Sequence, residues 1–102
     1  MDAQEILRLY ATGHRDFSHV SLVQACLINA KLIGAKLIGA ELVGADLRGI
    51  DLTEAHLNQA KLNQVNLAGA EMIQACLTHA DLRGAYLSGA DLTHADLSGA
   101  NL

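Results

Sequence analysis

Large apolar side chains occupy every fifth position from Phe17 to the end of the chain. All eighteen positions in this series are leucine except Phe17 and Met72, and an alanine stands two residues before the large residue in fourteen of the eighteen units. Side chains two positions apart point to the same side of an extended backbone. We therefore expect each alanine and the large residue after it to face inward, and the mostly polar residue between them to face outward.

The second residue after each large residue is glycine in eight of seventeen units, which predicts a corner with positive φ, as at the third residue of a type II turn. A period of five leaves no single buried stripe on an α-helix, and an odd period cannot keep one face of a flat strand buried. The pattern therefore predicts a chain that turns every five residues and stacks on itself as a solenoid.

Residues 2–12 depart from the repeat and are predicted to form a short helix. Asp2 and Glu5 have the spacing of a capping box, and Gly13 is well placed to end the helix. One face of this helix is expected to cover the open backbone edge of the first coil, with binding of a partner as the alternative role. The residues of that face are Ile6, Leu9 and Tyr10.

The runs AKLIGAELVGADLRG and ADLRGAYLSGADLTHADLSGANL resemble the pentapeptide-repeat proteins, whose signature is A(D/N)Lxx. This resemblance implies an all-β fold, a right-handed parallel β-helix of quadrilateral cross-section with four pentads per coil, and so four to five coils here. The stretch LRLYATGHRDFSHVSL resembles the N-terminal cap of bacterial, particularly cyanobacterial, members. The expected organisation is a capping helix and turn over residues 1–14 and a β-helix over residues 15–102.

No helix or polar cap follows the last pentad, so the C-terminal coil is expected to be uncovered. Either the chain has been cut from a longer solenoid, or a second copy covers this coil in a homodimer about a twofold axis. The net charge of −4 and the pI of about 5.6 provide no basic surface for nucleic acid or for an anionic membrane. Without a membrane-spanning segment or a secretory signal, the protein is expected to be cytoplasmic.

When the chain is stacked in coils of twenty residues, one column contains side chains that could act in catalysis or bind a metal. These are His56, Cys76 and Asp96, and His79 is near Cys76 in sequence. A cysteine nucleophile beside a histidine base, or a partial site for a soft metal, would use such residues. The column is expected to be convex and solvated, without an oxyanion site. We therefore predict no catalytic residue, no metal site, no cofactor and no enzymatic activity. Cys26 lies on another face, so both cysteines are expected to be reduced thiols.

Two surface features are candidates for partner binding. The first is an apolar girdle at positions where later coils carry mostly polar residues, although β-branched side chains also suit this backbone. The second is an acidic stripe, which is either a solvated face or part of a surface that mimics duplex DNA. The resemblance implies this alternative, because some pentapeptide-repeat proteins, including quinolone-resistance members, bind type II topoisomerases such as gyrase in this way. The girdle consists of Val23, Ile28, Ile33, Ile38 and Val43, and the stripe of Asp51, Glu71 and Asp91.

The sequence thus predicts a non-enzymatic scaffold or protein-interaction module with an unknown protein partner, and a gyrase-binding DNA mimic as the alternative. Lysines and arginines interrupt the acidic positions, whereas a duplex mimic should present dense negative charge along its length. We therefore prefer the scaffold to the mimic.

Overall fold

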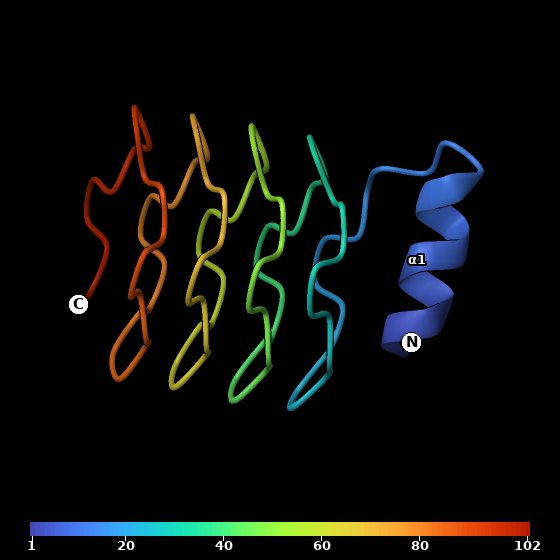
Figure 1. Cartoon of the computed structure of the whole chain (residues 1–102), viewed down its shortest axis with the longest axis horizontal. Coiled ribbons are helices and arrows are strands. Elements are labelled where there is room, and N and C mark those ends of the chain that lie inside the picture. The colour runs from blue at the N-terminus through green and yellow to red at the C-terminus, as the bar shows by residue number, and fades with distance from the viewer.

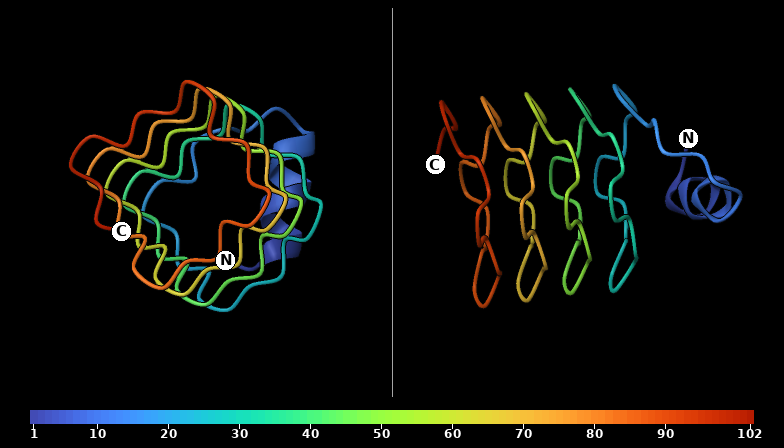
Figure 2. Two further views of the ribbon diagram at one scale, coloured as in Figure 1. Left: turned by 60° about the vertical axis from the view of Figure 1, so that its left-hand side comes forward. Right: turned by 90° about the horizontal axis from the view of Figure 1, so that it is seen from above.

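The computed structural model describes all 102 residues. One helix, α1 (Ala3–Ala11), lies across the end of a stack of coils (Figure 1). The remainder contains no continuous strand. Its β-pairing consists of fourteen isolated parallel bridges, each joining residues twenty positions apart. Four pentads therefore make one coil, and the chain traces a four-sided ring when it is viewed obliquely along the stack (Figure 2).

Each coil is hydrogen-bonded to both of its neighbours through the backbone. The amide of Lys61 donates to the carbonyl of Ala40 in the preceding coil at 2.9 Å, and the amide of Leu62 donates to Asp81 in the following coil at 2.8 Å. A corner every five residues leaves room for only one bridging residue per pentad, so the β-pairing consists of single bridges. The predicted twenty-residue register is confirmed.

The core is a column of inward-facing alanine and large apolar side chains. All 25 buried residues are hydrophobic, and no polar or charged residue is buried. Burial is complete in the middle of the stack, where Leu62 has no exposed surface, and is lost at the C-terminal end, where 75% of Leu102 is exposed. The alternation of inward and outward positions predicted from the pentads is therefore confirmed.

Positive φ is a property of the corner and not of glycine. The eight corner glycines have φ between 66° and 73°, and the nine other corner residues have φ between 58° and 66°. For residues other than glycine the left-handed conformation costs about 1–2 kcal/mol, so packing and hydrogen bonding between coils must impose it. The nine residues are His19, Gln24, Asn29, Glu54, Gln59, Gln64, Gln74, His79 and His94.

Two corner glycines allow the cost of this conformation to be separated from steric crowding. A Cβ at Gly39 would lie 2.6 Å from Nδ1 of His19, whereas a Cβ at Gly69 would meet nothing within 4 Å. We expect Gly69→Ala to lower the free energy of unfolding by about 1 kcal/mol through backbone strain, and Gly39→Ala to lower it further. Urea denaturation of both variants measures this difference, and in a His19→Ala background it should disappear. Equal losses in the wild-type background would contradict the expected crowding.

Local capping determines where α1 begins and ends. The carboxylate of Asp2 accepts a hydrogen bond from the amide of Glu5 at 2.9 Å, and Thr12 is the C-cap, so the helix is one residue shorter at each end than the predicted residues 2–12. The amides of Gly13 and His14 donate to Tyr10 and Leu9, each at 3.0 Å, which is a Schellman motif. No helix in the structure has both the length and the apolar character needed to cross a membrane.

The apolar face of α1 packs on the first coil. Ile6 is fully buried, and Leu9 and Tyr10 are partly buried against the core. The hydroxyl of Tyr10 donates to the carbonyl of Ile33 at 2.7 Å. The guanidinium of Arg15 lies 3.6 Å from the centre of the Tyr10 ring and donates to the Tyr10 carbonyl at 2.9 Å. These contacts fix the C-terminal half of the helix against the coil.

Candidate interaction surfaces

The apolar girdle is a ring around the solenoid. Successive pentads lie on successive sides of a coil, so Val23, Ile28 and Ile33 occupy three sides of the first coil, and Ile38 follows on the fourth side at the start of the second coil. Val43 lies beside Val23 in the next coil, where its carbonyl accepts from Gln24 at 2.9 Å. A partner with a flat surface can therefore reach only part of the girdle. The exposed fractions are 51% for Val23, 40% for Ile28 and 41% for Ile33, while Ile38 and Val43 are half-buried.

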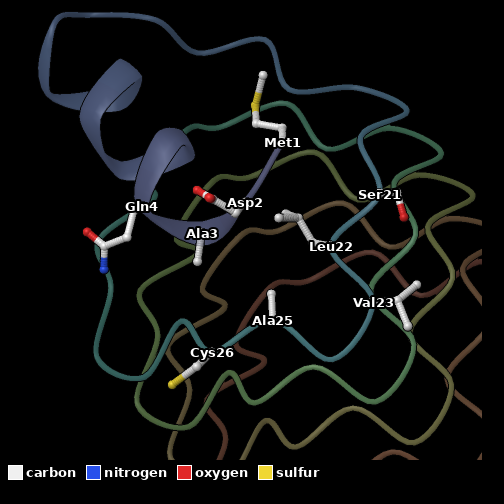
Figure 3. A pocket seen from close by; sticks show the side chains of 9 residues that line it. All are labelled: Met1, Asp2, Ala3, Gln4, Ser21, Leu22, Val23, Ala25 and Cys26. Atoms are coloured by element: carbon white, nitrogen blue, oxygen red, sulfur yellow. The ribbon is translucent and has the colours of Figure 1, made fainter.

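A groove of about 440 Å³ adjoins the girdle at Val23 (Figure 3). It lies between the N-terminal turn of α1 and one corner of the first coil, and most of its lining is apolar. Sequence analysis missed this N-terminal groove, because the repeat pattern does not contain the direction in which the helix crosses the coil. The lining residues are Met1, Asp2, Ala3, Gln4, Ser21, Leu22, Val23, Ala25 and Cys26.

The acidic stripe forms one column, in which Asp51 pairs with Glu71 and Glu71 with Asp91 as parallel bridges. The half-buried carboxylate of Asp51 accepts from the amide of Thr53 at 3.1 Å and from its hydroxyl at 2.7 Å. Burial raises the pKa of Asp51, but these hydrogen bonds outweigh it, and the pKa lies below its usual value. Asp91 binds Thr93 in the same way. Two of the three carboxylates of the stripe are thus already hydrogen-bonded within their own pentads.

Two further acids are neutralised within their own pentads, a pairing that sequence analysis missed. Arg83 donates from Nε and Nη2 to the two carboxylate oxygens of Asp81 at 2.9 and 2.6 Å, and Arg48 binds Asp46 with the same fork. The signal was present in the sequence as aspartate followed two residues later by arginine. Glu41, Lys61 and Asp81 follow one another in a column of bridges, but only one ion pair forms along it. Lys61 lies 3.8 Å from Glu41, whereas Asp81 pairs with Arg83.

The pair of Asp81 and Arg83 predicts a dependence of stability on pH. Hydrogen bonds from Arg83 hold the pKa of Asp81 well below its usual value. A carboxyl with a lowered folded-state pKa stabilises the fold above the unfolded-state pKa of about 3.9, and this contribution is lost as the pH falls through the folded-state pKa. The free energy of unfolding should therefore fall below about pH 4, and should fall less in Arg83→Gln. Urea denaturation at pH 6 and pH 3 tests this, and an unchanged fall in the variant would contradict it.

The column of His56, Cys76 and Asp96 is formed as expected, through consecutive bridges. The thiol of Cys76 accepts from the side-chain amide of Asn58 at 2.8 Å, and Asn58 also donates to the hydroxyl of Thr78 at 2.7 Å. Both cysteines of the chain are free thiols. No three His, Cys, Asp or Glu side chains of the structure converge in a way that could hold a metal ion.

Comparison with known proteins gives these surfaces a family context. The family model described as pentapeptide repeats matches residues 16–53, 50–89 and 75–102. The structure is similar to a pentapeptide repeat protein, Rfr23, from the cyanobacterium Cyanothece 51142, with 36% identity and a TM-score of 0.84 over 84% of this chain. It is also similar to one from Nostoc PCC 7120, with 37% identity and a TM-score of 0.86 over 87% of this chain.

This chain is shorter than these relatives, spanning 58% of the Cyanothece protein and 74% of the Nostoc protein. A 26-residue segment, 26% of this chain, is 73% identical to 16% of an uncharacterised protein from Synechocystis. QnrB1, a plasmid-mediated fluoroquinolone resistance protein, shares the fold with 17% identity and a TM-score of 0.56 over 86% of this chain and 58% of its own. The pentads and their matches show that this chain belongs to the pentapeptide-repeat family, whose solved members imply a right-handed quadrilateral β-helix.

Proposed function

We propose that this protein is a non-enzymatic scaffold whose partner binds the girdle at the first coil. The observation that carries the proposal is the exposure of Val23, Ile28 and Ile33 at outward positions. The backbone does not require apolar residues there, because the equivalent positions of the next three sides include Arg48 and Thr53. Exposed apolar surface that the fold does not need is typical of an interface.

The position of the N-terminal groove favours one part of the girdle as the binding surface. Val23 lines the groove and Val43 lies beside it, while Ile28 lies around the corner from Val23, in the pentad of Cys26. These residues form two adjacent sides of the solenoid with a recess at their N-terminal end. A partner that covers this corner would bury exposed apolar side chains and fill the recess at the same time.

Paired aspartate substitutions test this proposal. Val23→Asp with Ile28→Asp should abolish capture of a partner from a cyanobacterial lysate by the immobilised protein, with captured proteins quantified by mass spectrometry. Asn63→Asp with Ser88→Asp adds the same charge on the same two sides in later coils and should leave capture unchanged. Circular dichroism should be the same for all three proteins. If the girdle variant captures the same proteins as the wild type, the girdle is not the interface.

The alternative function, gyrase binding by DNA mimicry, has less support from the charges. Arg48, Arg83 and Lys61 each bind a carboxylate, and the net charge is only −4. QnrB1 is similar in fold alone. We expect no inhibition of gyrase-catalysed DNA supercoiling at concentrations on the order of tens of micromolar. Inhibition in that range would favour the mimic over the scaffold.

We also propose that two copies of this chain associate through the last coil. Leu102 is 75% exposed, and the amides of Leu87, Leu92 and Leu97 have no hydrogen-bond acceptor. A second copy meeting this coil about a twofold axis would cover both the apolar side chains and the backbone groups. Light scattering after size exclusion should give twice the chain mass of 10.8 kDa, including after hundredfold dilution. A monomer throughout would contradict the association.

A further inference from the structure

The N-terminal edge of the first coil contains backbone groups that no other part of the chain satisfies. In the second coil the amides of Glu41 and Asp46 donate to the preceding coil at 2.9 and 2.8 Å. The equivalent residues of the first coil are Ser21 and Cys26, whose amides make no hydrogen bond. Their N–H groups point away from the second coil, because this is the direction in which the amides of Glu41 and Asp46 point.

The carbonyl groups of this edge are unpaired as well. In the second coil, the carbonyls of Glu41 and Val43 accept from the first coil at 2.7 and 2.9 Å. No donor reaches the equivalent first-coil carbonyls, which belong to Ser21, Val23, Cys26 and Ile28. Residues 21–28 therefore form an open edge with two free donors and four free acceptors.

Each neighbouring side of the same edge has one carbonyl in contact with the cap. On one neighbouring side the hydroxyl of Tyr10 donates to Ile33 at 2.7 Å, and on the other the carbonyl of Asp16 lies within hydrogen-bond distance of the His14 ring, at 2.8 Å. The side chains of Ser21 and Cys26 are exposed to solvent. Contacts from α1 and its turn thus occupy one carbonyl on each neighbouring side and none on residues 21–28.

The N-terminal groove runs beside this stretch. Figure 3 shows Leu22 and Ala25 from the coil and Ala3 from α1 around the groove, with Ser21 and Cys26 on its coil side. Its volume of about 440 Å³ is within the range of about 300–1,000 Å³ that is usual for ligand pockets. In β-augmentation, a protein binds a peptide through unpaired backbone amides and carbonyls at the edge of its β-structure, and neighbouring pockets accept side chains of the peptide.

We propose that the open edge binds a peptide segment of a partner protein that runs parallel to residues 21–28 and turns at the same corner, with one apolar side chain in the N-terminal groove. This inference rests on the proposed scaffold function and specifies the partner. Along residues 21–28, the free amide hydrogens are partially positive and the free carbonyl oxygens are partially negative. The backbone of another peptide presents acceptors and donors in the matching order. A complete coil cannot stack here, because α1 lies across the same end of the solenoid (Figure 1).

Hydrogen exchange with a synthetic peptide tests the pairing directly. The probe is acetyl-ADLRGAYLSG-amide, the sequence of residues 80–89, which pairs in parallel with a preceding coil in this structure. At saturation the amides of Ser21 and Cys26 should exchange about tenfold more slowly, measured by NMR. The amide of Lys31, which is also unpaired but lies outside the groove, should be unaffected.

The matched control peptide carries N-methyl groups on both leucines, which removes donors that would reach the open edge. It should not slow exchange at Ser21 or Cys26. The inference is overturned if neither peptide slows exchange at about 1 mM, or if both slow it equally. Slow exchange without peptide that depends on protein concentration would also overturn it, because a second copy would then occupy the edge.

Alkylation of the two free thiols gives an independent readout. Cys26 is exposed and lines the groove, whereas Cys76 is half-buried on another side. The probe should slow the reaction of Cys26 with iodoacetamide about tenfold and leave the reaction of Cys76 unchanged. Slowing at both thiols, or at neither, would count against binding in the groove.

A proline substitution separates this inference from the proposed function. Cys26→Pro removes one free donor of the open edge and leaves the girdle side chains in place. Peptide binding and partner capture should both weaken in this variant. If partner capture survives in Cys26→Pro but is lost in the girdle variant, the scaffold function stands and the open edge is not the binding site.

Discussion

Leu62→Ala is expected to lower the free energy of unfolding by about 2–5 kcal/mol. Leu62 has no exposed surface and lies in a central coil, with Leu42 and Leu82 in the two neighbouring coils, both buried. Removing three carbons from such a site loses their transfer free energy and leaves a cavity that the surrounding coils cannot fill. A backbone tied to both neighbours by hydrogen bonds has little freedom to collapse around the gap.

The matched control is Leu102→Ala, which removes the same atoms from the same column at an exposed position. Leu102 is 75% exposed in the single chain, so its substitution should change the stability of the monomer by less than about 0.5 kcal/mol. Urea denaturation followed by circular dichroism measures both variants. If Leu62→Ala cost no more than Leu102→Ala, the coil register that places Leu62 in the core would be wrong.

The coil register could be predicted because the pentads repeat it throughout the chain. The alanine and leucine positions determine the inward faces, and the corner glycines indicate the bend. Once coils of twenty residues are assumed, the neighbours of Asp51 or Cys76 follow from arithmetic. The positive φ of His19 and Gln59 did not follow from their residue type, because packing between coils imposes a conformation that these residues do not favour.

The surfaces were less predictable, because a surface side chain can often reach several oppositely charged side chains and pairs with only one of them. Asp81 binds Arg83 in its own pentad and not Lys61 in the preceding coil, a choice that depends on the geometry of one corner. The girdle was identified from the sequence as a series of apolar residues, but its arrangement as a ring follows from the coil. The N-terminal groove depends on how α1 crosses the first coil, and no repeat position contains that information.

Lys61→Pro and Ser21→Pro, at equivalent positions two coils apart, are expected to differ sharply in their effect on stability. The amide of Lys61 donates to the carbonyl of Ala40 at 2.9 Å, and Ala40 is fully buried. Proline has no N–H, so the substitution leaves that carbonyl without its donor at a cost of about 1–3 kcal/mol, before any clash of the ring with the preceding coil.

Ser21 has no acceptor for its amide and no coil before it, so the same substitution there removes no hydrogen bond. Proline is tolerated on the edge of a sheet for this reason, and it also restricts the unfolded chain. Urea denaturation should therefore show a large loss for Lys61→Pro and a change within about 0.5 kcal/mol for Ser21→Pro. An equal loss at both positions would mean that the Ser21 amide is satisfied in the folded protein. The edge would then be closed, and peptide binding by residues 21–28 would lose its physical basis.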